Sequence, residues 1–570
     1  MYFYENNSCR FTGSSVLRVA DKEHRCEARI LDGGEIAHRE AHQPRVFARI
    51  AIQSSVSYLK GYSAGSVLDV ICAAVVREFE TSLNLRRETS LNSSQKLKPL
   101  VVNVNGTLVR GDTLMEALLV TLLRRSATLW TLALALLRGR SALKKTLADL
   151  AVYDPKTVPL RQEVLEFLKS EKQRGRELHV ATGADQSIAD CVAERTGLFI
   201  SAEGSQQGMN LRGRSKLERL RQRFPEGFAY TVNDTRDSLV WQDASSIVLV
   251  GASGRTRRLT QRMGFSIERE IPDQKTNVRH WLKAIRIHQW AKNLLLFVPL
   301  FLAHRYTQFE SFVQVLLGFV GLGLVASGTY LINDLSDLDA DRVHDTKRNR
   351  PVARSDIGPG SAFAAALTLL AAGLGIGVYQ NHSFAALLLV YAAVSLSYSL
   401  HFKKVPIFDV FLLACLYTLR ILMGTLLVAV DVSPWLLVFS LFFFLSLSIA
   451  KRHVEIVRAG QRGTGASFIA GRGYNASDAP LTIALGVTSS MSAILILFLY
   501  IVNDAYPIGA YGHPQWLWLI GIIVFLWALR IWFLSHRALL DDDPVAFALR
   551  DPISWLLGVL ALGVFVAAIL

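Results

Sequence analysis

Cysteine is scarce in this chain of 570 residues, and no two cysteines form a CxxC pair or a metal-binding spacing. The five positions are widely scattered: Cys9, Cys26, Cys72, Cys191 and Cys415. This pattern excludes a disulfide framework and a cysteine-based zinc site. The N-terminal residues MYFYENNSCRFTG also lack the apolar core of a signal peptide. We therefore expect membrane insertion to be directed by segments further along the chain.

Acidic residues are in the minority, since 47 Asp and Glu face 62 Lys and Arg and the net charge is +15. Such an excess would suit nucleic acid, but no aromatic and basic binding module stands out. The cytoplasmic loops of membrane proteins collect Lys and Arg, which is a simpler explanation. The chain is also too long for one ordinary domain. We expect a multidomain protein in contact with a bilayer and without a nucleic-acid partner.

Long apolar runs are concentrated after about residue 290, in a chain with a hydrophobic fraction of 51% and a mean hydropathy of +0.29. A helix needs about 20 mostly apolar residues to cross a bilayer, and about nine segments meet that measure. They begin near Leu294, Phe312, Ser361, Ser383, Ile407, Trp435, Leu481, Trp516 and Ile553. The fold class predicted for this half is an all-α bundle of about nine transmembrane helices.

The basic residues of the connecting loops alternate strictly from one loop to the next. They gather at 342–354, 403–404, 451–472 and 530–550, and in the segment before the first span. The loops around Asn381, Asp431 and Asp504 contain no Lys or Arg, and only Arg305 lies between the first two spans. The positive-inside rule then predicts a multi-pass protein of the cell inner membrane. Its N-terminal half is expected in the cytoplasm and its C-terminus on the opposite side.

An acidic cluster follows the second apolar run in the stretch TYLINDLSDLDADRVHDTKRNRPVARSD. Spacings of three and four residues place Asp334, Asp337 and Asp341 on one face of a continuing helix, whereas Asp339 falls off that face. Carboxylates at this spacing suit Mg²⁺, which prefers hard oxygen ligands and often shares them with phosphates. The basic residues that follow suit phosphate oxygens. They are Arg342, Lys347, Arg348, Arg350 and Arg354. The pattern favours a diphosphate site at the mouth of a membrane bundle; the alternative is a solvated loop whose acids and bases pair.

Further polar groups lie at the same predicted edge of the membrane. The segment YSLHFKKVPIFD supplies Tyr398, Lys403, Lys404 and Asp409, and SIAKRHVEIVRAG supplies Lys451, Arg452 and Glu455. Arg420 lies about a dozen residues into a span, where an arginine is costly unless it is paired or lines a wet cavity. Asp409 shares its helix face at a distance of about three turns, so direct contact is not expected. For Lys451 and Arg452 the alternative to a site role is snorkelling towards the interface.

Taken together, these segments resemble the UbiA-type intramembrane prenyltransferase superfamily from Trp281 to Leu570. Its first motif, NDxxDxxxD, reads here as Asn333, Asp334, Asp337 and Asp341. Within the superfamily the likeness is strongest to decaprenyl-phosphate phosphoribosyltransferases. Four segments carry it: IRIHQWAKNLLLFVPL, NDLSDLDADRVHDTKRNRPV, YSLHFKKVPIFDVFLLACLYTLRILMG and AKRHVEIVRAG. One departure is Arg354 and Ser355, where relatives usually have a small residue and a glycine.

The resemblance implies a Mg²⁺-dependent transfer of a 5-phosphoribosyl group from phosphoribosyl diphosphate to a polyprenyl phosphate, with release of diphosphate. The implied metal ligands are Asp334, Asp337 and Asp341, and the implied catalytic set adds Lys403 and Asp409. The implied substrate-binding residues are Asn333, Arg342, Lys347, Arg350, Tyr398, Arg420, Lys451, Arg452 and Lys292. Two alternatives stay open. One is transfer of a prenyl chain from a prenyl diphosphate to an aromatic acceptor, and the other is a non-catalytic membrane transporter or scaffold.

The region from about Leu97 to Pro272 alternates strands and helices, which predicts an α/β fold. It resembles the haloacid dehalogenase-like phosphatases, whose first motif is DxDxT. Asn103 and Asn105 replace the two aspartates, and Thr107 is kept. The later motifs map to Thr182, Lys216, Asn233 and Asp237. An amide cannot attack phosphorus as a carboxylate does and binds Mg²⁺ weakly, so we predict no phosphatase activity. A scaffold or regulator is favoured over a binder of phosphorylated ligands.

Three domains are therefore predicted: an unassigned extension at 1–95, a degenerate phosphatase-like domain at 96–275, and a transferase domain at 276–570. The apolar stretch Met115–Leu137 is interrupted by Arg124 and Arg125, so each half is too short to span a bilayer. Its position suits a helical cap inserted after the first phosphatase motif. The alternative is an amphipathic face resting on the membrane. In the extension, only VLDVICAAVVREFE is predicted to be helical.

Overall fold

The computed structural model divides the chain into two compact units, Met1–Lys96 and Leu97–Leu570. It describes residues 97–570 apart from 151, 207–208, 274–275, 462–471, 508, 510 and 541–543. In the first unit it describes four antiparallel strands, in the order β1-β2-β3-β4. These are Phe3–Glu5, Ser8–Arg10, Leu17–Lys22 and Arg25–Ile30. The helix predicted at 67–80 lies outside the described residues.

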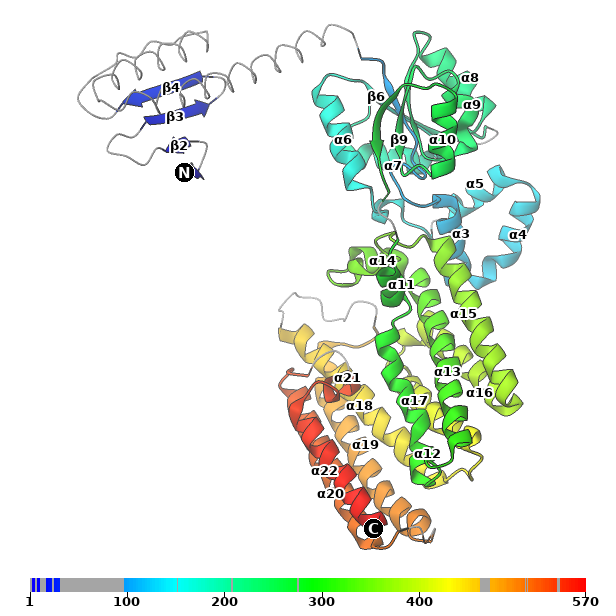
Figure 1. The fold of residues 1–570 in the computed structure, drawn as a ribbon, viewed down its shortest axis with the longest axis vertical. Coiled ribbons are helices and arrows are strands. Elements are labelled where there is room, and N and C mark those ends of the chain that lie inside the picture. The colour runs from blue at the N-terminus through cyan, green and yellow to red at the C-terminus, as the bar shows by residue number, and fades with distance from the viewer. Residues whose placement is uncertain are drawn as a thin grey trace. The chain divides into compact units, whose positions relative to one another are not determined.

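A six-stranded parallel sheet forms the first half of the second unit, in the order β10-β9-β8-β5-β6-β7 (Figure 1). The strands are β5 (Leu100–Val102), β6 (Leu178–Asp185), β7 (Ser201–Ser205), β8 (Ala229–Val232), β9 (Ser246–Val250) and β10 (Ile267–Ile271). The helices between them include α6 (Gln162–Gln173), α7 (Gln186–Thr196), α8 (Arg214–Arg223) and α10 (Gly254–Arg262). The central strands are buried throughout, as expected for a parallel sheet covered on both faces. The predicted α/β fold is confirmed.

Three helices are inserted between β5 and β6, where the cap was predicted. They are α3 (Thr113–Arg124), α4 (Leu129–Leu137) and α5 (Arg140–Leu150). Asp112 caps the start of α3 by accepting a hydrogen bond from the Leu114 N–H, and Arg124 and Arg125 end the helix. The three helices pack on one another through a small apolar cluster that includes Ala117, Leu132 and Leu143.

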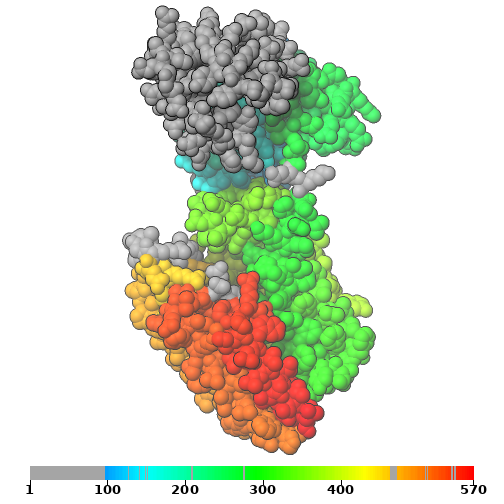
Figure 2. Space-filling view, turned by 60° about the vertical axis from the view of Figure 1, so that its left-hand side comes forward, coloured from blue at the N-terminus to red at the C-terminus, as the bar shows by residue number. Residues whose placement is uncertain are grey.

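A helical bundle forms the second half of the unit. Eight of its described helices are long and apolar enough to cross a membrane. They are α13 (Phe309–Ser336), α15 (Pro359–Gln380), α16 (His382–Leu400), α17 (Phe408–Val428), α18 (Pro434–Gln461), α19 (Ala479–Tyr500), α20 (Leu517–His536) and α22 (Pro552–Ile569). Figure 2 shows the orange and red helices α19, α20 and α22 along one side of the bundle.

The first predicted span, near Leu294, is not a long α-helix, so eight of the about nine predicted spans are long α-helices in the described part of the chain. An 11-residue 3₁₀ helix, η5 (Ile287–Phe297), leads instead into the short α12 (Val298–Leu302). A 3₁₀ helix rises about 2 Å per residue, so these 16 residues extend about 30 Å, the thickness of a bilayer core. The segment packs against α13 and α17, and Arg305 beyond it donates to the Val428 carbonyl at the far end of α17. It therefore accompanies the spans from one end towards the other.

Candidate functional site

The acidic motif lies where α13 gives way to the short helix α14 (Leu338–Val343). The helix predicted to run through the motif is interrupted at Asp337. Helical hydrogen bonds still cross the interruption, because the Asp337 N–H donates to the Asn333 carbonyl at 2.9 Å and the Asp341 N–H to the Asp337 carbonyl at 2.8 Å. The carboxylates of Asp334 and Asp341 are almost fully buried, and that of Asp337 is half-buried. The sequence thus places two negative charges where only a charged partner can compensate them.

Each of these three carboxylates contacts a basic side chain. Arg350 donates from one nitrogen to Asp334 at 3.0 Å and to Asp341 at 2.5 Å, and so joins the two. Arg286 also pairs with Asp334 and lies over the ring of Tyr330, one helical turn earlier. Lys403, from the loop before α17, donates to both oxygens of Asp337 at 2.5 and 2.7 Å. The site therefore combines acids for a cation with bases for an anion.

The chemistry of these donors fits Mg²⁺, which takes carboxylate oxygens and shares them with phosphates. Among the described residues, no three acidic, histidine or cysteine side chains are gathered closely enough to enclose a metal ion, and Arg350 and Lys403 contact the acids. Burial raises the pKa of the Asp341 carboxyl to about 6, although the Arg350 guanidinium lowers it and Asp334 raises it further. A divalent cation beside these acids would offset the repulsion between the Asp334 and Asp341 carboxylates.

A second basic centre lies inside the bundle, around Arg420 on α17. Its guanidinium donates to Asn293 of η5 at 3.1 Å, to the Tyr391 hydroxyl of α16 at 2.8 Å and to the Leu416 carbonyl at 2.5 Å. The same group lies over the rings of Tyr391 and Tyr417. The Lys292 ammonium also lies over the Tyr417 ring, 5.7 Å from its centroid. Three segments, η5, α16 and α17, thus supply partners for the Arg420 guanidinium. A buried charge within a membrane span needs such partners to offset the free-energy cost of burying it.

Asp409 and Arg452 form a buried ion pair at 2.8 Å, with side chains 0% and 1% exposed. The Tyr474 hydroxyl donates to Asp409 at 2.7 Å, and Glu455 pairs with Arg452. This pair joins α17 to α18, so Arg452 does not snorkel and Asp409 has no contact with Arg420. Neither residue contacts the acidic motif in this arrangement. We interpret the pair as a support for the site and not as part of the reacting groups, in contrast to the roles that the resemblance implies.

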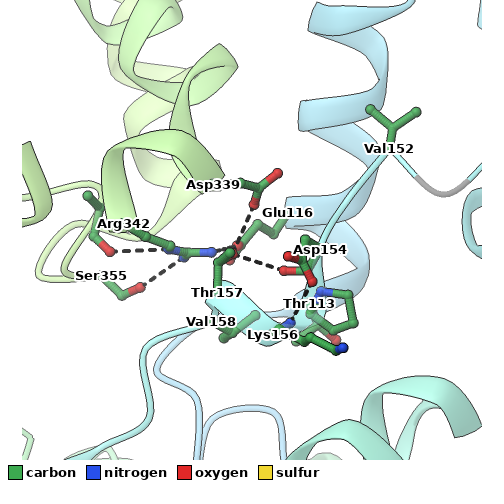
Figure 3. Close-up of polar contacts among 12 residues, drawn as sticks. Thr113, Glu116, Val152, Asp154, Lys156, Thr157, Val158, Asp339, Arg342 and Ser355 are labelled. Atoms are coloured by element: carbon green, nitrogen blue, oxygen red, sulfur yellow. Dashed lines mark hydrogen bonds and ion pairs between the residues drawn. The ribbon is translucent and has the colours of Figure 1, made fainter. Parts of the chain in front are cut away.

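Arg342 contacts the α/β domain, and Figure 3 shows its side chain between Ser355 and Glu116. Its guanidinium pairs with Glu116 of α3, and both side chains are buried, at 3% and 1% exposed. It also donates to the Ala353 carbonyl at 3.2 Å and lies 3.5 Å from the Ser355 hydroxyl. Ser355 has φ +60°, a conformation that favours glycine. The departure from the family pattern at this turn is therefore part of a contact with the α/β domain.

Asp339 takes part in the same contact and not in the acidic site. Arg124, the last residue of α3, donates to its carboxylate at 2.8 Å and to the Ser336 carbonyl at 2.7 Å. Thr157 donates to the other oxygen of Asp339 at 3.2 Å, and Arg110 pairs with Asp356 at 3.1 Å. Apolar side chains complete the contact, because Val120 of α3 packs in a cluster that includes Leu331, Leu335 and Ala362. The α/β domain thus holds both ends of α14.

Arg286 and Arg472 are the site residues that sequence reasoning missed. Arg472 donates to the Tyr398 hydroxyl at 2.9 Å and to the Lys403 carbonyl at 3.4 Å, so it supports the lysine that holds Asp337. Lys347 is close enough for its ammonium to interact electrostatically with Asp341 and Asp337. Arg286 lies within a segment that carried the family resemblance, which is the signal that could have identified it. Arg472 is in no such segment. Lys451 lies beside Arg452 on α18.

Four of the degenerate phosphatase residues follow the carboxyl ends of β5 and β8 in the middle of the sheet, whereas Thr182 lies in β6 and Lys216 on α8. Lys216 donates to Asp237 at 3.0 Å and to the Tyr230 hydroxyl at 2.7 Å, and the Asn103 side chain lies 3.5 Å from the same carboxylate. Burial raises the pKa of Asp237, but Lys216 and Tyr230 outweigh it, so that pKa is lowered overall.

Asn105 does not contact Asp237 and instead binds the start of the cap. It accepts hydrogen bonds from the Thr113 N–H at 3.4 Å and hydroxyl at 3.0 Å, at the start of α3. The amide of Asn233 lies against Gly106, where a side chain would collide with it. Thr182 is fully buried in β6, and its hydroxyl accepts from the Ala184 N–H at 3.2 Å. The amides and the lysine therefore have structural partners within the domain.

Comparison with known proteins finds a family match for the membrane half and relatives by sequence. The model of the UbiA prenyltransferase family matches residues 294–550. The protein y4nM of Sinorhizobium fredii is 39% identical over 485 residues, which cover 85% of this chain and 94% of that protein. Nodulation protein NoeC of Azorhizobium caulinodans is 32% identical over 276 residues, 48% of this chain and 87% of that protein. Decaprenyl-phosphate phosphoribosyltransferase of Mycobacterium tuberculosis is 27% identical over 280 residues, 48% of this chain and 89% of that protein.

Two solved structures resemble the two halves separately. A UbiA homolog from Archaeoglobus fulgidus bound to GPP and Mg²⁺ covers 51% of this chain and 99% of its own, with a TM-score of 0.39 and 17% identity. A substrate-bound phosphoserine phosphatase covers 33% of this chain and 99% of its own, with a TM-score of 0.23 and 16% identity. The family match over residues 294–550, together with eight described helices able to cross a bilayer, leads to one conclusion: this chain contains a multi-pass membrane domain of the UbiA prenyltransferase family.

Proposed function

We propose that this protein transfers a 5-phosphoribosyl group from phosphoribosyl diphosphate to a polyprenyl phosphate and releases diphosphate. The observation that carries the proposal is the density of basic groups, with a cation on each motif carboxylate and a second cationic centre within the bundle. A prenyl donor with an aromatic acceptor that carries no phosphate brings a single diphosphate. A phosphoribosyl donor and a lipid phosphate together bring three phosphorylated groups, which would use both centres.

The acidic motif is the proposed binding place for the diphosphate. Asp334, Asp337 and Asp341 would hold Mg²⁺, and the bound cation would neutralise charge on the diphosphate as it leaves. Arg350, Arg286 and Lys403 now contact those carboxylates, so each is placed to bind a phosphate oxygen when substrate enters. The same side chains then hold the donor in one orientation, which is a large part of catalysis for this kind of displacement.

The centre around Arg420 is the proposed place for the phosphate of the lipid or of the sugar. Its guanidinium and Lys292 share the ring of Tyr417. The side-chain nitrogen of Asn293 is buried and has no hydrogen-bond partner within the described part of the chain, so a donor is available for a phosphate oxygen. In the reaction, an oxygen of the acceptor phosphate bonds to ribose C1 while the C1–O bond to diphosphate breaks. The acceptor is already ionised, so no strong general base is required.

A labelled-donor assay tests the proposal. Phosphoribosyl diphosphate carrying a radiolabel in the ribose is mixed with the purified protein in lipid, Mg²⁺ and polyprenyl phosphate. We expect label to move into the lipid phase and to require the polyprenyl phosphate. A parallel reaction offers a labelled prenyl diphosphate and an aromatic acid. Transfer in the second reaction alone would establish the aromatic route, and transfer in neither would favour a non-catalytic role.

The α/β domain is proposed to be a scaffold without phosphatase activity. Its α3 begins at Thr113, which donates to Asn105, continues through Glu116 and ends at Arg124, so a single helix connects the degenerate site to the acidic motif. Asn103 cannot act as the phosphoryl nucleophile, and Lys216 is held by Asp237. The domain would therefore contribute by fixing the position of α14.

We expect the full-length protein, and equally its isolated 97–275 fragment, to release no phosphate from an aryl phosphate in the presence of Mg²⁺. Lys216→Ala is the matched control, because a genuine phosphatase site of this fold would lose its activity with that change. Hydrolysis above background that disappears in Lys216→Ala would contradict the prediction. Hydrolysis that persists in the variant would indicate a contaminating enzyme.

A further inference from the structure

The cap helix α4 exposes a large apolar surface that packing within the domain does not explain. Of its nine residues only Leu132 and Ala135 are buried, and these two complete the cap core. The side chains of Trp130 and Leu137 are 82% and 85% exposed, and three further leucines are more than half exposed. The three are Leu129, Leu134 and Leu136. A contiguous exposed apolar surface of this kind marks an interaction site.

The helix cannot cross a bilayer, because nine residues extend only about 14 Å. It can lie along one, however, since its exposed residues run the full length of the helix. Trp130 is at its beginning, and tryptophan favours the boundary between lipid and water because its ring is apolar and its N–H is polar.

The electrostatics of the segment suit a negatively charged membrane surface. Between Glu116 and Asp149 the sequence contains no acidic residue and six basic ones. The six are Arg124, Arg125, Arg138, Arg140, Lys144 and Lys145. Arg124 and Lys144 are used inside the protein, but Arg125, Arg138 and Lys145 are exposed around α4. Apolar side chains flanked by basic ones are typical of helices that lie in the interface of an anionic bilayer.

The position of the cap places α4 at the level of the bilayer surface. Met115 of α3 lies against Gly360 at the start of α15, and Arg124 binds the carbonyl of Ser336 at the end of α13. These are ends of two helices long enough to span a membrane. With 28 residues α13 extends about 42 Å, more than the 30 Å or so of hydrocarbon, so its last turns reach the headgroup region. Figure 1 shows α4 at the outer edge of the cap, at this end of the bundle.

We propose that α4 is a membrane-surface anchor, and that Trp130, Leu134 and Leu137 insert into the headgroup region of an anionic bilayer with Arg125, Arg138 and Lys145 beside them. A membrane face was the less favoured interpretation of this stretch from the sequence. The structure favours the membrane face over core packing, because only Leu132 and Ala135 of α4 are buried in the cap core. The anchor would add a second attachment of the α/β domain to the membrane, besides its contact with α13 and α14.

The test places an environment-sensitive fluorophore on α4 in the full-length protein. Leu134→Cys is labelled in a background without the five native cysteines, and the protein is reconstituted in nanodiscs that contain anionic lipid. Ile200→Cys is the matched control, because Ile200 is 66% exposed and precedes β7, whose other end, at Ser205, is the end that contacts the cap. We expect a blue-shifted emission and strong quenching by spin-labelled lipid at position 134, and neither at position 200.

The other outcomes are equally informative. Replacing Arg125, Arg138 and Lys145 by glutamine should reduce the quenching at position 134, as should nanodiscs of neutral lipid. If the label at 134 is as water-exposed as the label at 200 in anionic nanodiscs, the proposal is wrong. If position 134 is protected only in native membrane vesicles, a protein partner covers α4 and the bilayer assignment is likewise wrong.

Discussion

Asp334→Asn is expected to reduce transfer of the labelled group by at least about 100-fold, the scale on which removing one charge-stabilising group acts. Asp334 is the motif carboxylate with two basic partners, Arg286 and Arg350. An amide in its place would weaken Mg²⁺ binding and would remove the carboxylate partner of Arg286, whereas Arg350 would keep Asp341. The initial rate of label entering the lipid phase, measured over a range of Mg²⁺ concentrations, gives the size of the effect.

Asp345→Asn is the matched control for this experiment, because Asp345 lies four residues beyond Asp341 but its side chain is exposed. That variant should transfer label at the rate of the unchanged protein. Both proteins must elute alike in size-exclusion chromatography, so that a loss of rate reports chemistry and not misfolding. Turnover of Asp334→Asn equal to that of Asp345→Asn would count heavily against a metal-dependent transferase at this motif.

The sequence was sufficient for the two architectures because each is governed by a local pattern. Buried strands that alternate with helices indicate a parallel sheet, and apolar runs of about 20 residues indicate spans. The 3₁₀ segment η5 has no such signature, since periodicity is calibrated on α-helices and strands. Its role as a passage through the bundle depends on packing against α13 and α17, which are distant in the sequence.

The sequence predicted which acidic residues form the candidate site, but it predicted their basic partners less well. The spacing of Asp334, Asp337 and Asp341 is local, so the sequence could place them near one another. Whether a basic residue faces those acids depends on tertiary contacts. Arg342 directly follows Asp341 but is turned towards Glu116, whereas Arg286 and Lys403 come from other segments.

The same limitation applies to buried charges in the bundle. Arg420 was recognised as unusual because it lies inside a span, and its partners Asn293 and Tyr391 come from two different helices. For Arg452 the sequence allowed snorkelling, but α17 supplies Asp409 at 2.8 Å. No local pattern reports such a pairing, because the partner is determined by which spans are neighbours.

Removing one member of the Glu116–Arg342 pair is expected to weaken the attachment of the α/β domain severely. Both side chains are almost fully buried, so Glu116→Leu or Arg342→Met leaves an uncompensated charge, at a cost of about 3 to 5 kcal/mol. The double variant Glu116→Leu/Arg342→Met removes both charges and should recover most of that loss. Hydrogen exchange of the α3 and α14 amides in the full-length protein measures the free energy of local opening in all four proteins.

Transfer activity provides the second measurement, because α14 carries Asp341 as well as Arg342. If the domain contact fixes α14, each single variant should need a higher Mg²⁺ concentration for half-maximal transfer, and the double variant should return towards the original value. A merely structural role would lower the amount of folded protein without changing that concentration. This second result rests on the proposed transferase function, whereas the exchange measurement does not.

An exposed ion pair serves as the control for the single and double variants at Glu116 and Arg342. Arg214 and Glu218 lie 3.4 Å apart with side chains 88% and 61% exposed, and pairs of this kind contribute little. Glu218→Leu should therefore leave both the exchange of α3 and the Mg²⁺ requirement unchanged. Single variants at Glu116 and Arg342 that behave like Glu218→Leu would show that the domains do not depend on this contact. In that case the remaining contacts, among them Arg124–Asp339 and Arg110–Asp356, would carry the attachment, and Asp339→Asn should increase the exchange of the α3 and α14 amides.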